Sequence, residues 1–475
     1  MSKISSHGNM IIKSQDQFCH ECILRWLPRN KNIDNYIREN QIDTMKTTEK
    51  IDGFQVQKND NSIVYKGNIV PIHPECTKDH AISKHNKVQE LSELFTSKSI
   101  WYQTLRNSIN SNMYDVVTLI NAPISSNNKF VSGWGSSDNY NLSQKKSFVE
   151  AIERFHTYLK PTNLKLIYGT ERDFYPKSEF LHFPKNSISN SKNLKKYSSN
   201  LNTAWVEVIS LITKSSAYIP IDYLLLKEYT LNNRFMNPTS TGIAGHFVKS
   251  KSLRNGFLEY IERYGQYIFW LENNFKKIKL STLRYDNFLK KLNTIESYNN
   301  KVHVYYKSIF NVHVVIVAIE TEKRQMIFSS AGDFIFEEAL LKSIDEGIGQ
   351  WFEFKDSDVN YEEYSEIKNP IDHLKFYLNP KNISYLESYI NKDEVHLKED
   401  PQKYTFEDAL LKLQKEKIDV LYIDRGSILT KCLGIYISQI FIPQLPYLTF
   451  DLTDIYIPNE IKNRSFYLKI PHPFS

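Results

Sequence analysis

The sequence predicts a mixed α/β (α+β) fold with an internal pseudo-duplication and a small cysteine-containing module at the N-terminus. Strand-like runs alternate with amphipathic helical segments from about residue 90 onward, which is typical of domains layered from sheets and helices. A loop of small residues followed by a Glu-x-x-Glu-Arg helix occurs twice, which indicates a repeated unit. The 475 residues, 41% of them hydrophobic, can bury a large core in two or more domains.

Each predicted element follows from its local pattern. Runs of β-branched and aromatic residues predict strands at 116–120, 164–168, 204–209, 302–306, 312–319, 420–423 and 435–442. Apolar residues at helical spacing predict helices at 143–159, 253–271, 336–352 and 406–415. Segment 170–203 is rich in Ser, Asn and Lys and is expected to be a long loop or insertion. Segment 279–300 is expected to be a polar helical connector.

The composition excludes several classes of function. The net charge of +6 is small for this length, and no basic block with interleaved aromatic residues is present, so no nucleic-acid partner is expected. Residues 1–13 lack the apolar segment of a signal peptide, and no apolar run reaches the length of a membrane span. We therefore expect a cytoplasmic protein that does not associate with membranes.

The most informative pattern is the repeated Glu-x-x-Glu-Arg motif. Its members are Glu150, Glu153 and Arg154 after the loop at 132–137, and Glu259, Glu262 and Arg263 after the loop at 240–245. Residues three apart share one face of a helix, so each motif presents two carboxylates side by side. Four converging carboxylates would need cations, and hard oxygen ligands beside phosphate are typical of a Mg²⁺ site. The alternative is that each motif is a solvated, salt-bridged helix face.

Together with later motifs, the two acidic helices resemble the YcaO family over about residues 90–475. The order matches that family: a first acidic helix, a second one after Ser-Thr-Gly-x-Ala-Gly, then Gly332-Asp333, Glu338-Ala339 and Glu346-x-x-x-Gln350. The segments 420–425 and Ile442-Pro443 resemble the late strand pair of the family. The chain ends in Pro-His-Pro-Phe-Ser, similar to the proline-alternating C-terminus of members that make azoline rings in peptides.

The resemblance implies an ATP-dependent cyclodehydratase that acts on a ribosomally made precursor peptide, as in bacteriocin biosynthesis. In this family a Cys, Ser or Thr side chain attacks the preceding amide carbonyl, ATP phosphorylates the resulting oxyanion, and phosphate leaves to give a thiazoline or oxazoline. The residues it implies for binding ATP and Mg²⁺ are Glu150, Glu153, Arg154, Glu259, Glu262, Arg263, Glu346 and Gln350. Its implied catalytic tail contains Pro471, Pro473 and Ser475, because a stiff proline-rich end can reach into a cleft.

Four positions depart from the family pattern. Trp134 stands where Lys is frequent in the first loop, and Lys146 stands where Ser is frequent before the first Glu pair. His246 replaces a common Asn after the second loop, and Lys251 occupies the place of an acidic residue. These substitutions concern the periphery of the nucleotide site, and the four carboxylates are unaffected.

A domain boundary is expected near residue 85, between a small module at 1–85 and the main domain at 86–475. Three of the four cysteines lie in the small module, which favours a local metal site over a disulfide framework. Cys19 and Cys22 form a Cys-x-x-Cys pair, and Cys76 follows in a His-Pro-Glu-Cys segment.

Two pairs of close ligands joined by a loop suit a tetrahedral Zn²⁺ ion. His80 is the first candidate for the fourth ligand, with His73 or Asp79 as alternatives. These segments resemble zinc-linked segments in the peptide-binding partners of azoline synthetases. The alternative is that the three cysteines bind no metal.

The resemblance also implies partners. They are the precursor peptide and a ubiquitin-activating-like protein that binds its leader, because the chain is too short to hold that partner domain as well. A flavin dehydrogenase in the same complex and a homodimer are further candidates. Two other functions stay open: a YcaO enzyme that forms thioamides or amidines, and a non-catalytic scaffold subunit, which the residues Trp134, Lys146 and Lys251 suggest.

Overall fold

The chain divides into two compact units. The computed structural model describes residues 2–7, 10–15, 50–51, 54–57, 62–65, 101–110, 113–121, 130–157, 165–175, 188–189, 195, 197–224, 235, 239–354, 367, 370–397, 400–448, 454–455 and 470–474. Unit 1 comprises Met1–Asn163, Ala244–Ser252 and Asp424–Ser438, and unit 2 comprises Leu164–Ile243, Leu253–Ile423 and Gln439–Ser475. Each unit is therefore assembled from segments that lie far apart in the sequence.

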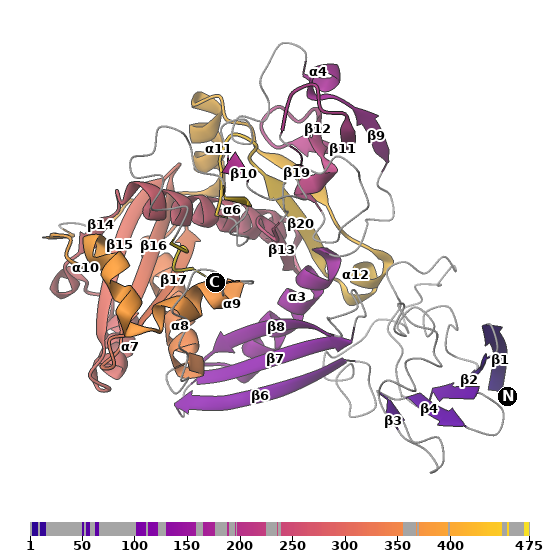
Figure 1. Ribbon diagram of the computed structural model, residues 1–475, viewed down its shortest axis with the longest axis horizontal. Helices are drawn as coiled ribbons and strands as arrows, with labels where there is room; N and C mark the ends of the chain where they lie inside the picture. The colour runs from indigo at the N-terminus through magenta and orange to yellow at the C-terminus, as the bar shows by residue number, and fades with distance from the viewer. Residues whose placement is uncertain are drawn as a thin grey trace. The chain divides into compact units, whose positions relative to one another are not determined.

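Unit 1 contains a three-stranded antiparallel sheet on which one helix packs. The strands β6 (Trp101–Asn110), β7 (Met113–Asn121) and β8 (Phe130–Ser137) follow one another in space as in the sequence. Helix α3 (Tyr140–Thr157) lies against β7 and β8 (Figure 1). Its side chains Phe148, Ile152 and Phe155 are buried, as the predicted apolar stripe requires.

The prediction of a loop at 132–137 is wrong, because these residues belong to strand β8. The glycines serve close packing rather than a turn. A Cβ atom on Gly133 would lie 2.2 Å from the Ala151 nitrogen, and one on Gly135 would lie 2.2 Å from the Ser143 carbonyl oxygen. Only glycine lets the strand backbone come this close to α3.

The loop predicted at 240–245 is also only partly correct, because strand β13 (Ile243–His246) begins inside it. The turn that precedes β13 is made at Gly242, whose φ of +78° lies in the left-handed region. A Cβ atom at this position would lie 2.3 Å from the Ile440 carbonyl oxygen, so glycine is required for two reasons.

The rest of unit 1 includes a second sheet and a short helix. The sheet has the order β1-β2-β5-β4-β3, with bounds β1 (Ser2–His7), β2 (Met10–Gln15), β3 (Lys50–Ile51), β4 (Phe54–Gln57) and β5 (Ser62–Tyr65). The helix is α12 (Ile428–Leu433). The predicted zinc ligands lie outside the described residues, so the zinc module and the boundary near residue 85 stay predictions.

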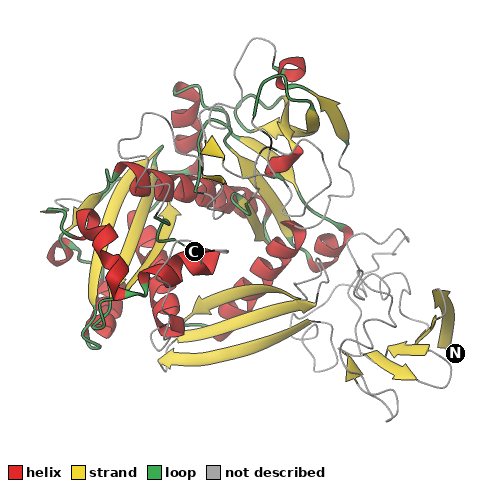
Figure 2. Ribbon diagram, viewed as in Figure 1, coloured by secondary structure: helices red, strands yellow, loops and turns green. Residues whose placement is uncertain are grey.

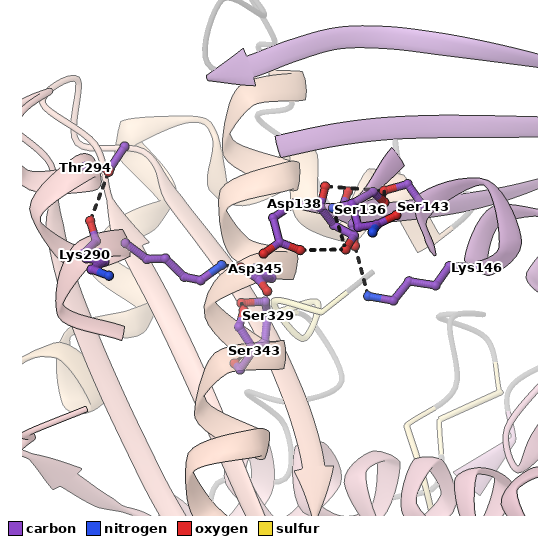
Figure 3. A network of polar contacts seen from close by, with 12 residues as sticks. Ser136, Asp138, Ser143, Lys146, Lys290, Thr294, Ser329, Ser343 and Asp345 are labelled. Carbon is purple, nitrogen blue, oxygen red and sulfur yellow. Dashed lines mark hydrogen bonds and ion pairs between the residues drawn. The ribbon is translucent and has the colours of Figure 1, made fainter. Parts of the chain in front are cut away.

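Unit 2 is built around a sheet with a helix on each face. The strand order is β17-β16-β15-β14-β18, with bounds β14 (Lys276–Ile278), β15 (Lys301–Ile309), β16 (Val312–Glu320), β17 (Met326–Asp333) and β18 (Glu394–Val395). Helix α6 (Lys249–Glu272) covers one face, where Gly265 meets Val314. Helix α8 (Phe336–Phe354) covers the other, where the Ser329 hydroxyl donates to the Ser343 carbonyl at 2.7 Å (Figures 2 and 3).

Another sheet has the order β12-β11-β19-β20-β13, and β9 pairs with β11. Strands β9, β11 and β12 belong wholly to unit 2, whereas most of β13 is assigned to unit 1. Its remaining strands are β9 (Leu166–Gly169), β11 (Thr203–Ser210), β12 (Ser216–Pro220), β19 (Leu421–Asp424) and β20 (Tyr436–Phe441). A two-stranded sheet pairs β10 (Ile188–Ser189) with β21 (Asp454–Ile455). The predicted long loop at 170–203 therefore contains short elements, namely α4 (Glu171–Phe174) and β10.

The remaining helices complete the described part of unit 2. They are η4 (Ile221–Tyr223), η5 (Leu280–Thr282), α7 (Asp286–Glu296), α9 (Pro370–Tyr377), η7 (Pro380–Leu386), α10 (Glu387–Ile390) and α11 (Phe406–Lys415). Helix α7 confirms the predicted helical connector. No helix within the described segments is long and apolar enough to cross a membrane.

Candidate functional site

In unit 1, Glu150 is tied to the strand that precedes its helix. The backbone N–H of Trp134 on β8 donates to Glu150 Oε2 at 2.6 Å. Arg154, one turn later on α3, pairs with Glu150 Oε1 at 2.7 Å and donates to the Ser132 carbonyl at 3.2 Å. Because the hydrogen bond to Glu150 comes from the backbone N–H of residue 134, it can form whether this residue is Trp, as here, or Lys, as is frequent in the family.

Glu153 accepts a hydrogen bond from strand β13. The backbone N–H of Gly245 donates to Glu153 Oε1. A Cβ atom on Gly245 would lie 2.8 Å from Val149 and 3.1 Å from the same carboxylate oxygen, so a larger residue would push the strand away from α3. The first acidic helix and the start of β13, which the sequence separates by some ninety residues, therefore meet in unit 1.

The side chains of Lys146 and His246, two of the four departures from the family pattern, each make a hydrogen bond to the backbone. Figure 3 shows Lys146 directed at the end of β8, where its Nζ donates to the Ser136 carbonyl at 3.0 Å. His246 accepts a hydrogen bond at Nδ1 from the backbone N–H of Val248 at 2.8 Å. Partial burial, together with the charge of Lys251, lowers the pKa of His246, so its imidazole is neutral near pH 7.

In unit 2, Glu262 is a buried carboxyl held by the end of β17. The Ser330 hydroxyl donates to Glu262 Oε1 at 2.6 Å, and the Gly332 N–H donates to Oε2 at 3.3 Å. Burial raises the pKa of Glu262, although the Arg263 charge and the two hydrogen bonds oppose the shift. A nearby cation would favour its ionised form, as a metal-binding carboxylate requires.

The other members of this motif lie on the same helix. Glu259 is partly buried and sits three residues before Glu262, so both project from one face of α6. Arg263 donates from Nη1 to Gln266 Oε1 at 3.3 Å, and Gln266 in turn donates to the Ser330 hydroxyl at 2.7 Å. Ser330 thus links the Glu262 carboxyl and the Arg263 guanidinium through one chain of hydrogen bonds.

Asp333, at the end of β17, is a residue whose role the sequence did not reveal. Its side chain is 2% exposed and binds two cations, Arg254 Nη2 at 2.9 Å and the Lys342 ammonium. It also accepts the Phe334 N–H at 2.7 Å. One carboxylate with two cations leaves an excess positive charge, and Lys342 is close enough to Glu262 to affect its titration. The Gly332-Asp333 motif was the feature of the sequence that could have indicated a role for Asp333.

The remaining predicted residues lie on α8 and in the tail. Gln350 donates from Nε2 to Glu346 Oε1 at 3.2 Å, as expected for residues four apart. Pro471 and Pro473 are buried in unit 2, and Ser475 lies outside the described residues, as do Cys19, Cys22, Cys76 and His80. Each unit alone contains two of the four motif carboxylates, and among the described residues no three His, Cys, Asp or Glu side chains are grouped as a metal site.

The described part of unit 2 also contains a polar cavity of about 1080 Å³. It lies beside η5 and the start of α7, and Arg284, Lys290 and Asp400 are among its lining residues. None of the predicted nucleotide-binding residues lines this cavity.

Unit 1 contains a buried histidine at the end of α3. His156 donates from Nδ1 to the Ile152 carbonyl at 2.8 Å, so its Nε2, 2.9 Å from the Ser427 hydroxyl, accepts from that group. Buried Arg425 donates to the His156 carbonyl. Burial, reinforced by the Arg425 charge, lowers the pKa of His156 from 6.5 to about 4.

This shift predicts a pH dependence of stability. Between about pH 6.5 and pH 4 the unfolded chain binds a proton at His156 that the folded chain does not. Its contribution to stability is therefore complete above about pH 6.5 and decreases as the pH falls towards 4. Urea denaturation at several pH values should show a shallower acid-side decline for His156→Gln than for the wild type. Parallel pH profiles would contradict a neutral buried His156.

Comparison with known proteins identifies the family. A family model described as YcaO cyclodehydratase, ATP- and Mg²⁺-binding, matches residues 134–446. The chain belongs to the YcaO family. The matched range contains both acidic helices, the end of β17 and α8, so all eight predicted nucleotide residues lie in the YcaO domain. Comparison with curated proteins gives no match.

Solved structures share the YcaO fold at low sequence identity. A heterocyclase in complex with substrate and cofactor has a TM-score of 0.61 at 13% identity, covering 77% of this chain and 52% of that one. The Escherichia coli microcin synthetase McbBCD complex gives 0.58 at 14%, covering 78% and 96%. YcaO from Methanopyrus kandleri bound with AMPPCP and Mg²⁺ gives 0.53 at 11%, covering 76% and 90%. The chain spans about half the length of the two heterocyclases it matches, 52% of one and 45% of the heterocyclase TruD.

Proposed function

We propose that this YcaO protein is an azoline-forming cyclodehydratase acting on Cys, Ser or Thr residues of a ribosomally made precursor peptide. The side chain of the peptide residue adds to the preceding amide carbonyl. The resulting oxyanion takes the γ-phosphoryl group of ATP and releases ADP. Loss of phosphate and of the amide proton then forms the C=N bond of the ring. One ATP is consumed, and the peptide loses one water, for each ring.

The residues fit a nucleotide carried with Mg²⁺. Each motif supplies two carboxylates, and hard oxygen ligands are those that Mg²⁺ prefers. Glu150, Glu153, Glu259 and Glu262 would hold the metal and ATP, with Glu346 and Gln350 in the same pocket. When bound, Mg²⁺ would neutralise phosphate charge during transfer.

The cationic side chains of the protein would bind the phosphate groups. Arg263 and Arg154 would bind the charged phosphate groups of ATP. Lys342, one of the two cations that Asp333 holds, adds positive charge near Glu262, which supports the placement of an anionic group on this side of α6. No protein nucleophile is needed, because the peptide supplies its own.

The observation that carries the azoline-forming proposal is the buried tail. His472 is 5% exposed and Phe474 is 1% exposed, so the proline-alternating end is packed into unit 2 rather than frayed. A docked, stiff end can place Ser475 at a fixed position. The microcin synthetase relatives were solved as complexes, one with pro-MccB17 bound. By analogy we propose a leader-binding partner, and a flavin dehydrogenase as a further candidate, for this chain.

The test is product mass together with ATP consumption. The protein, its partner and a Cys-containing precursor peptide are incubated with ATP and Mg²⁺. We expect loss of one water per ring, with ADP and phosphate formed in step. Exchange of oxygen for sulfur or nitrogen would instead indicate thioamide or amidine formation. Absence of any ATP consumption would indicate a scaffold subunit.

We also propose that residues 1–85 bind one Zn²⁺ through Cys19, Cys22, Cys76 and His80, with His73 or Asp79 as alternatives to His80. Elemental analysis should give about one zinc per chain, lost in Cys19→Ser and Cys76→Ser. Structural zinc binding contributes folding free energy, so limited proteolysis should cut residues 1–85 faster in these variants while the main domain survives. A metal-free chain that resists proteolysis at its N-terminus would disprove the zinc site.

A further inference from the structure

Helix α9 carries two side chains that hold the backbone of the C-terminal tail, residues 470–474. The Tyr377 hydroxyl donates to the Pro471 carbonyl at 2.5 Å. His373 Nδ1 lies 3.1 Å from the His472 carbonyl oxygen. A carbonyl oxygen can only accept, so His373 carries its proton at Nδ1. The two residues are four apart and therefore share one face of α9.

The two prolines explain why side chains, rather than backbone groups of a neighbouring strand, form hydrogen bonds with the tail. Neither Pro471 nor Pro473 has a backbone N–H, so the tail cannot join a regular strand ladder through them. Its carbonyl groups remain as acceptors, and α9 satisfies two consecutive ones. His472 precedes a proline and is therefore restricted to an extended backbone, which keeps these two carbonyls in a defined relation.

Ring contacts hold the tail both on α9 and on the elements opposite it. The imidazoles of His373 and His472 stack with their centroids 4.0 Å apart and their planes at 22°. Phe474 packs against Phe269 on α6 at 5.9 Å and against Phe328 on β17 at 6.1 Å between ring centroids. The tail is thus held between α9 and the central sheet up to the residue before Ser475.

We propose that His373 and Tyr377 are positioning residues that set where the last residues of the chain lie during ring formation. This inference rests on the proposed function, because it gives the tail a part in the reaction. Both residues act on the tail and not on the nucleotide. Their loss should lower kcat for ring formation and leave the KM for ATP unchanged.

The first test measures whether the tail is held, without any assay of activity. Carboxypeptidase digestion of the full-length protein should release Phe474 at least about fivefold faster from Tyr377→Phe than from the wild type, because the ring remains but one anchor is lost. Tyr389→Phe is the matched control. Its hydroxyl also donates to a buried carbonyl, that of Trp270, but not to the tail. Equal release from Tyr377→Phe and the wild type would overturn the proposal.

A second pair of variants separates the hydrogen bond from packing. His373→Asn keeps an amide N–H close to the position of Nδ1, whereas His373→Leu has nearly the same shape and no donor. Both lose the stacked imidazole. We expect slower release of Phe474 from His373→Asn than from His373→Leu. Equal release from the two would remove the hydrogen-bonding role of His373.

The kinetic test uses a Cys-containing precursor peptide and the same variants. In Tyr377→Phe we expect kcat for ring formation to fall about threefold or more, with the KM for ATP as in the wild type and in Tyr389→Phe. Unchanged ring formation in Tyr377→Phe would overturn the positioning role. Deletion of residues 471–475 then distinguishes the causes: if the deletion also leaves ring formation unchanged, the proposed role of the tail itself fails.

Discussion

Glu262→Gln is expected to abolish Mg²⁺-dependent ATP turnover while the protein stays folded. Glutamine has nearly the same shape, and its single amide oxygen can still accept from the Ser330 hydroxyl, which donates to Glu262 at 2.6 Å. The weaker bond from the Gly332 N–H, 3.3 Å from the other oxygen, is lost. The burial that raises the pKa of Glu262 favours a neutral side chain, which offsets part of that loss, so the protein should stay folded. What is lost is a negatively charged oxygen ligand. The barrier to phosphoryl transfer should rise by several kcal/mol, a fall in turnover of at least about a hundredfold.

Glu153→Gln in unit 1 should have the same effect, because the proposal gives both helices the same metal and nucleotide. Glu272→Gln serves as the control, since Glu272 is an exposed residue on the same helix as Glu262. ADP release at saturating ATP and Mg²⁺ measures the result. Turnover at the wild-type rate in Glu153→Gln or Glu262→Gln would show that the site is assigned wrongly.

Deletion of residues 471–475 is expected to leave ATP binding nearly intact and to cut ring formation at least about tenfold, on the order of 1.4 kcal/mol of transition-state stabilisation. The deleted residues include the buried Phe474, which packs on Phe269 and Phe328. The loss of packing could destabilise the fold by itself, so thermal denaturation must accompany the assay.

Phe474→Leu with the full tail retained is a suitable comparison for the deletion. It reduces the packing while the backbone of Pro471 and His472 remains available to α9. We expect it to lose less ring formation than the deletion at a similar melting temperature. Ring formation at the wild-type rate in the deleted protein would remove the main support for the azoline-forming subclass.

Local patterns in the sequence predicted much of the fold. The apolar stripe through Phe148, Ile152 and Phe155 gave α3, and the β-branched run at 312–319 gave the buried central strand β16. Both signals depend on residues a few positions apart. The same local rules failed at Gly133 and Gly135, because glycine there permits close packing against α3 rather than a turn.

The parts that could not be predicted depend on contacts between distant segments. Arg254 and Asp333 form an ion pair across 79 positions of sequence, and no local pattern links them. The assignment of residues 244–252 to unit 1, where Gly245 donates to Glu153, likewise arises only in the folded chain. The C-terminal prolines were visible as a motif, whereas the side chains that hold them, His373 and Tyr377, lie almost a hundred residues earlier.

The central claim is that the two Glu-x-x-Glu-Arg helices serve one nucleotide. Calorimetric titration with AMPPCP and Mg²⁺ tests it most directly in four proteins: the wild type, Glu153→Gln, Glu262→Gln and the double variant. We expect one site in the wild type and a loss of affinity of at least about tenfold in each single variant. In the double variant the loss should be clearly different from the sum of the two single effects, because ligands of one metal are coupled. Strictly additive effects, or a loss confined to one helix, would contradict a shared site.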